Sequence, residues 1–203
     1  MLYGDAVGRS LTKFKCKRCG RCCSKIGELA LFEWEAERLR RYSVRIKPVL
    51  TSELNGSRII LQWGLEGKNK RQCPFLTKRG CIIYEKRPLV CKAFPFMTSG
   101  IALKNLEKIL SKTCENLIIP FKNGEKMKKQ EALKILEETY NGSYSSAMAL
   151  DTAREWIKEM FEYAAESGVA PDEKEIGLFE MLRKYNIMNP KEIEDEIRRL
   201  ESM

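Results

Sequence analysis

The run Cys-Lys-Arg-Cys-Gly-Arg-Cys-Cys at residues 16–23 is the most distinctive stretch of this chain. Its first three cysteines are separated by two residues each, a spacing that lets tight turns present several sulfur atoms to one side. Gly20 allows a positive φ or a close backbone approach in the middle of the run. Because residues 1–28 show neither helix nor strand periodicity, we predict an irregular, metal-binding loop.

Sulfur is the donor that this sequence offers a metal, because the chain contains eight cysteines and no histidine. The missing histidine removes the usual general base, His-bearing zinc sites and Cys-His nucleophile pairs. In an intracellular chain, cysteines are more often ligands or redox groups than a disulfide framework. The predicted metal ligands are Cys16, Cys19, Cys22, Cys23, Cys73, Cys81, Cys91 and Cys114.

Two kinds of metal centre compete for these thiols. The C-x2-C-x2-C spacing is that of ferredoxin-type iron-sulfur sites, in which a cysteine followed by proline takes part, and Cys73-Pro74 has that dipeptide. Structural zinc usually needs a second closely spaced pair, which the other cysteines lack. We therefore favour an iron-sulfur cluster, [4Fe–4S] first, with zinc as the alternative. A thioredoxin-like redox pair and a disulfide-stapled core rank lower.

The assignment of eight sulfurs to one or two sites stays open at this point. Cys22 and Cys23 are adjacent, so their side chains diverge, and we expect one to bind the metal while the other serves a second site, a supporting contact or the core. Cys114 lies in a region of helical pattern, where a buried small side chain explains it nearly as well as a ligand role does.

Charge is distributed unevenly along the chain. Up to Leu150 there are 29 Lys and Arg against 14 Asp and Glu, whereas the remainder has 8 against 14. The densest cluster of cations interleaves with the first four cysteines, where positive charge favours thiolates. A basic segment also fits nucleic acid, but this partner is not favoured because the charge has a local use.

Hydrophobic periodicity predicts the regular elements. We expect a helix from Leu29 to Tyr42, short strands at Arg58–Trp63 and Cys81–Tyr84, and helices in the last 80 residues. No apolar stretch is long enough to span a membrane and the N-terminus lacks a secretory signal, so we expect a cytoplasmic protein.

The fold class that follows is α+β and mostly helical, with an irregular Cys-rich metal-binding core, a small β element and a C-terminal helical lobe. We place a cysteine-cluster domain at residues 1–123 and a helical region that packs on it at 124–203, because cysteines stop at the Asn123-Gly124 turn and amphipathic helices follow.

Three blocks in order resemble the YkgJ-like CxxCxxCC family of zinc- or iron-chelating proteins. They are Cys16-x-x-Cys19-Gly20-x-Cys22-Cys23, then Cys73-Pro74-Phe75-Leu76, then Gly80-Cys81-Ile82-Ile83-Tyr84-Glu85-x-Arg87-Pro88-x-x-Cys91-x-x-Phe94-Pro95. The resemblance covers about residues 14–114; Lys92 replaces the arginine that is common after the last cysteine. It implies a metal or iron-sulfur cluster held by the cysteines.

Several functions are consistent with this resemblance. We rank an iron-sulfur carrier or redox protein with an unknown protein partner first. Some family members are described as iron-sulfur oxidoreductases, and flagellin lysine N-methylases look similar across the cysteine region, so an enzyme is the second class. A zinc-dependent nucleic-acid-binding module is the third. For Arg87 and Tyr84 we expect a structural role, with hydrogen bonds that orient the loop before Cys91.

Overall fold

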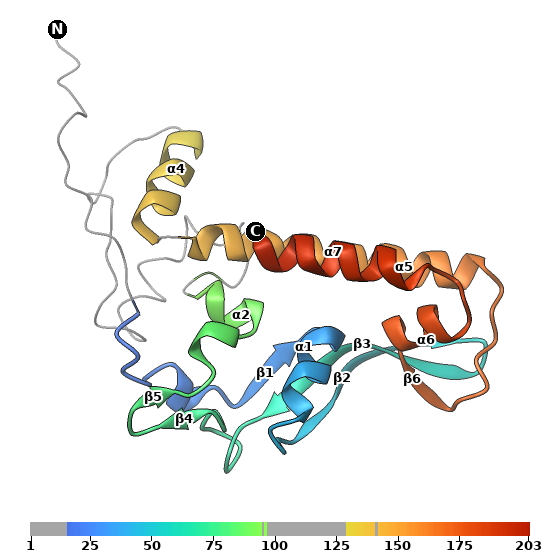
Figure 1. Ribbon diagram of the computed structural model, residues 1–203, viewed down its shortest axis with the longest axis horizontal. Helices are drawn as coiled ribbons and strands as arrows, with labels where there is room; N and C mark the ends of the chain where they lie inside the picture. Colours follow the sequence, from blue (N-terminus) through green and yellow to red (C-terminus); the bar gives the residue numbers. More distant parts are fainter. Residues whose placement is uncertain (1–15, 95, 97–128, 141) are drawn as a thin grey trace, which may run out of the picture.

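The computed structural model describes residues 16–94, 96, 129–140 and 142–203. It has an α+β fold in which helix exceeds strand, as predicted from the sequence. Figure 1 shows a twisted sheet below a layer of helices, with several short elements at one end. The strands are β1 (Glu28–Leu31), β2 (Ile46–Leu54), β3 (Ser57–Glu66), β4 (Leu76–Thr77), β5 (Gly80–Cys81) and β6 (Glu175–Gly177). The α-helices are α1 (Glu33–Arg40), α2 (Leu89–Lys92), α4 (Lys129–Tyr140), α5 (Ser143–Glu166), α6 (Leu178–Lys184) and α7 (Pro190–Ser202).

The larger sheet is built around β3. Strand β2 pairs antiparallel with β3 through the two-residue Asn55-Gly56 turn. Both turn residues have positive φ, 49° and 88°, as a type I′ hairpin requires. The other edge of β3 is shared by β1, which pairs antiparallel at Trp63–Glu66, and by β6, which pairs in parallel at Arg58–Ile60. Strand β6, from the last 30 residues, thus completes a sheet whose other strands come from the first 70 residues.

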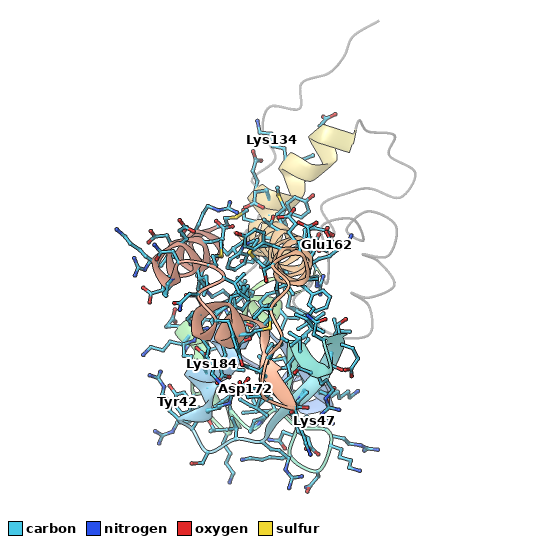
Figure 2. All side chains as sticks on the ribbon, turned by 90° about the vertical axis from the view of Figure 1, so that its right-hand side faces the viewer. Tyr42, Lys47, Lys134, Glu162, Asp172 and Lys184 are labelled. Carbon is cyan, nitrogen blue, oxygen red and sulfur yellow. The ribbon has the colours of Figure 1, made fainter. Side chains whose placement is uncertain are left out.

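The helical layer covers this sheet. Helices α5 and α7 run side by side in Figure 1, with α1 and α6 between them and the sheet. Figure 2 gives the same layering from the side, with Lys134 and Glu162 on the helical side and Tyr42 and Lys47 on the sheet side. The buried rings of Trp34, Trp156 and Phe179 contact one another where the layers meet.

The predicted helix from Leu29 to Tyr42 is wrong in its first third. Residues 28–31 form β1, and the helix begins only at Glu33. Leu29 and Leu31 are both buried, as alternation in a strand requires, and β1 gains backbone partners along β3. Leu29 is compatible with both a helical stripe and a strand. The backbone hydrogen bonds with β3 favour the strand.

Two further predictions need correction. The predicted strand Cys81–Tyr84 is only the two-residue β5, followed by the 3₁₀ helix η2 (Tyr84–Lys86), while Arg58–Trp63 lies within the longer β3. Strand β2 has no counterpart among the predicted elements, because most of its side chains are not buried and Pro48 interrupts it. The predicted boundary after residue 123 lies outside the described residues and stays a prediction.

Candidate metal site

Seven of the eight predicted ligands line one cavity of about 950 Å³. All seven are free thiols, so none is lost to a disulfide. They come from three separate parts of the chain: Cys16, Cys19, Cys22, Cys23, Cys73, Cys81 and Cys91. Cys114 lies outside the described residues. The structure therefore brings together the sulfurs that the sequence places up to 75 positions apart.

Five of these thiols form an inner group. The charges of Cys22, Cys73 and Cys91 all act on Cys23, and Cys81 acts on both Cys73 and Cys91. These effects define a group of thiols that influence one another across the cavity. Of the remaining two, Cys16 is half-buried against the core and Cys19 is exposed; we call them the outer pair. The thiols are thus sorted into an inner group of five (residues 22, 23, 73, 81 and 91) and an outer pair.

Backbone hydrogen bonds attach the first cysteine loop to the segment before Cys73. The N–H of Cys73 donates to the carbonyl of Cys23 at 2.7 Å, and the N–H of Gly27 donates to the carbonyl of Arg71 at 2.9 Å. Only the 3₁₀ turn η1 (Cys23–Lys25) is regular within residues 16–27. The predicted irregular conformation is confirmed over residues 16–27, and the position of this loop depends on contacts with a distant segment. Residues 1–15 lie outside the described residues.

Two glycines allow this loop to pack on the β4–β5 hairpin. Gly20 has φ +77°, and a Cβ there would approach Leu76 Cδ1 to 2.8 Å. Gly80 has φ +96°, and its Cβ would come within 3.2 Å of the Arg18 carbonyl oxygen. Any other residue would be strained and would separate the loop from the hairpin. The two glycines therefore allow the loop that carries Cys22 to lie against the hairpin that carries Cys81.

Cys91 is positioned by the short helix α2 and a buried glutamate. The Glu35 carboxylate accepts hydrogen bonds from the N–H of Leu89 at 2.7 Å and from the N–H of Phe32 at 3.0 Å. The first bond fixes the start of α2 and the second fixes the start of α1. Burial raises the pKa of Glu35 to about 7, although both N–H groups favour its charged form. One side chain thus ties the helix that carries Cys91 to the body of the fold.

Cys22 and Cys23 behave as a pair that shares a proton. Their sulfur atoms lie 3.8 Å apart. The hydrogen bond between the two sulfurs lowers the pKa of Cys22 to about 6, against the opposing effect of burial. The same hydrogen bond, together with burial, raises the pKa of Cys23. The contact therefore favours one thiolate within the pair, the form that binds metal.

The other inner thiols hold their protons more tightly in the metal-free protein. Removal of water by the surrounding protein raises the pKa of Cys73 and of Cys91, and neighbouring thiols add to the effect. The guanidinium of Arg87 acts in the opposite direction on both Cys22 and Cys91. Metal binding at these sulfurs must therefore displace protons, which makes it pH-dependent.

Arg87 has the structural role predicted for it. Its Nε donates to the carbonyl of Tyr84 at 2.7 Å, and its guanidinium stacks on the Tyr84 ring with 3.8 Å to the centroid. Arg18 stacks on the same ring at 3.8 Å and pairs with Glu85 at 3.3 Å. The ring is therefore held between two cations, which connects the first cysteine loop to the turn before Cys91.

The thiolate donors of this cavity are the kind that soft metals prefer. Thiolate sulfur selects zinc or iron-sulfur clusters, and the inner group supplies more than the four thiolates that either needs. Within the described part of the chain, no three Cys, Asp or Glu side chains are already grouped as a closed metal site. Metal binding would therefore require these sulfurs to move closer together.

Sequence reasoning missed the two buried glutamates of α1. Glu33 accepts hydrogen bonds from the N–H groups of Phe179 and Glu180 at the start of α6, at 3.0 and 2.7 Å. Glu35 accepts a hydrogen bond from the N–H of Leu89 at the start of α2. The sequence feature that could have indicated their burial is the position of the two acidic residues within an apolar run. The first turn of an exposed helix has the same pattern, because acidic residues are favoured there.

Comparison with known proteins supports the cysteine interpretation. Residues 15–135 match the model of a family named CxxCxxCC and described as a "Putative zinc- or iron-chelating domain". No curated protein and no solved structure matches the chain. None of the helices in the described part has the length and apolar character that crossing a membrane requires. Since the match spans more than half of the sequence, the chain belongs to the CxxCxxCC family of zinc- or iron-chelating domains.

Proposed function

We propose that this protein holds a [4Fe–4S] cluster through cysteine thiolates and has a redox or other cluster-dependent role inside the cell. The observation that carries the proposal is the convergence of thiols from three chain segments on one cavity. The ligands are Cys73, Cys81 and Cys91, with the fourth from the Cys22–Cys23 pair. When bound, such a cluster would supply one-electron transfer.

The surroundings of the inner thiols are compatible with such a cluster. A cluster held by four thiolates is anionic, and Arg87 already acts electrostatically on Cys22 and Cys91. The cysteine of the pair that does not bind can donate a hydrogen bond to the neighbouring sulfur, a contact that tunes reduction potential. Cys16 and Cys19 lie outside the inner group and are not required as ligands.

Anaerobic purification with iron, sulfide and zinc analysis tests the proposal. We expect about four iron and four sulfide per chain and broad visible absorption. Colourless protein with about one zinc per chain would establish the zinc alternative, and absence of all three elements would refute metal binding.

A matched pair of variants tests the ligand set. Cys73→Ser removes an inner thiol and should lower the iron content below about a tenth of that of the unmodified protein, because serine is a poor ligand for iron. Cys19→Ser removes an outer, exposed thiol and should leave the iron content unchanged. Equal losses in the two variants would refute the division into inner and outer thiols.

The other functions predicted from the sequence remain predictions. No contact among the described residues specifically favours a lysine N-methyltransferase or a nucleic-acid-binding module.

A further inference from the structure

We infer that the cysteine cavity also binds a small organic anion, with an oxyanion group on an apolar body, beside the metal. This inference rests on the proposed function and names the ligand class of the same site. Its first support is size, because about 950 Å³ lies at the upper end of the range for small-molecule pockets. A four-thiolate metal centre, with metal-to-sulfur distances of about 2.3 Å, occupies only part of such a volume.

The charges that line the cavity supply the second argument. Two carboxylates take part in the lining, and each is paired: Glu28 with Lys47 at 2.7 Å and Glu85 with Arg18 at 3.3 Å. Four further cations line the cavity and make no ion pair with any described residue: Lys17, Lys25, Arg87 and Lys92. The cavity therefore carries positive charge that the protein side chains do not balance.

The metal centre does not balance this charge either. Four thiolates around a divalent ion or a doubly charged cluster core contribute about two negative charges. Against the four unpaired cations, about two positive charges are left over. A ligand with a carboxylate or phosphate group offsets this excess.

The remaining lining suits the two parts of such a ligand. Leu76 and Phe94 are half-buried and offer an apolar surface. Ser143 and Ser146, at the start of α5, line the same cavity, and their hydroxyl groups make no hydrogen bond with the rest of the described chain. Apolar walls with a few convergent polar groups are typical of a site that orients a small molecule.

Calorimetric titration of the anaerobically purified protein tests the inference with three probes that share one apolar chain. Hexanoate and hexyl phosphate carry the anionic group, and hexan-1-ol is the neutral match. We expect one of the anions to bind one per chain at least tenfold more tightly than the alcohol, with an affinity that falls as salt is added. The preferred anion identifies the carboxylate or the phosphate class. Binding of the alcohol as tight as that of both anions, or no binding of any probe at millimolar concentration, would overturn the inference.

Variants locate the site. Lys92→Met and Lys25→Met each remove a lining cation and should weaken anion binding about tenfold, the loss expected for one hydrogen bond to a charged group. Lys25 is exposed, so its replacement leaves the fold intact even where Lys92→Met does not. Lys68→Met, an exposed cation outside the cavity, should bind like the unmodified protein. Unchanged binding in both cavity variants would place the anion elsewhere.

Metal analysis on the same samples separates the two proposals. Protein that contains iron or zinc but binds neither anion retains the proposed metal function and loses only the anion site. Protein that binds the anion without metal retains the anion site and refutes the metal proposal.

Discussion

The cysteine end of the molecule and its sheet-helix body are stabilised in different ways. The cysteine end comprises residues 16–27 and 67–92, whose regular elements are at most four residues long. The sheet-helix body comprises β1–β3, β6, α1 and α5–α7, with the ten-residue β3 and the 24-residue α5. Side chains such as Leu39, Ile59 and Leu182 are completely buried in the body. The difference teaches that long elements and their packing hold the body. The cysteine end joins the core through a few buried side chains, such as Phe75 and Leu89, and otherwise depends on backbone hydrogen bonds and, by our proposal, on a metal.

Removal of the metal should have the largest effect, and at the cysteine end alone. Metal binding to structural thiolate sites contributes about 10 kcal/mol or more to local folding. We expect amide protons of residues 16–27 and 67–92 to exchange at least a hundredfold faster after chelation, while those of β3 and α5 keep their protection. Hydrogen exchange with mass spectrometry measures both regions in one experiment. Equal loss of protection in the body would show that the two regions fold as one unit.

Truncation of a core side chain should destabilise the sheet-helix body without changing the metal content. Leu182→Ala removes a completely buried side chain from α6 and should lower the free energy of unfolding by about 2–5 kcal/mol. Urea denaturation measures the loss, and the metal content of the folded protein should not change. Ile82→Ala is the control from the cysteine end, since Ile82 is 63% exposed and should cost less than about 0.5 kcal/mol.

The two buried glutamates of α1 provide the sharpest test, because they make the same kind of contact in the two regions. Glu33→Ala leaves the N–H groups of Phe179 and Glu180 without an acceptor, and Glu35→Ala does so for Phe32 and Leu89. Each variant should lose about 1–3 kcal/mol.

Only Glu35→Ala should also weaken metal binding, since only Glu35 positions the helix that carries Cys91. Competition with a chromogenic chelator gives the affinity. An equal affinity in both variants would mean that α2 holds its position without this glutamate.

The smallest effect should be that of pH on the body, measured over a single pH unit. Burial raises the pKa of Glu33 from 4.5 to about 7, so the folded protein binds a proton that the unfolded chain releases between these values. The free energy of unfolding therefore falls as pH rises from 4.5 to 7, by up to about 1.4 kcal/mol per pH unit from this group.

Glu33→Gln should remove this contribution. Urea unfolding of both proteins at pH 5, 6 and 7 isolates it, because other titrating groups cancel in the difference. A difference that stays constant with pH would show that Glu33 is ionised throughout.

The sequence predicted the two regions to different extents, for physical reasons. Local rules were sufficient at the end of the chain: Asn189 accepts a hydrogen bond from the N–H of Lys191 at the start of α7, and Ile193 and Leu200 are buried as their spacing predicts. The start of α5 does not follow the same rules. Its N-cap is Gly142 with φ +86°, whereas Ser145 and Ser146, which are favoured cap residues, lie inside the helix.

Long-range contacts account for what local rules missed. Strand β1 depends on pairing with β3, and β6 pairs in parallel with residues more than 100 positions earlier. Pro171 is of a type favoured in the first turn of a helix, but the chain from 175 to 177 is extended because it completes the sheet, and α6 begins only at Leu178. The convergence of cysteines on one cavity could be anticipated from their spacing, whereas the division into five inner and two outer thiols depends on where the glycines and α2 place each loop.

The late pairing of β6 has a consequence for synthesis of the protein. On the ribosome, one edge of β3 at Arg58–Ile60 stays open until residue 177 has emerged, roughly ten seconds later at ordinary elongation rates. During this interval the nascent chain presents Ile59 and Ile60 beside unpaired backbone groups, the kind of segment that chaperones bind and that aggregates when left uncovered. The first cysteine loop and its partner segment are complete well before then, so the metal can be loaded on a chain whose sheet is still unfinished.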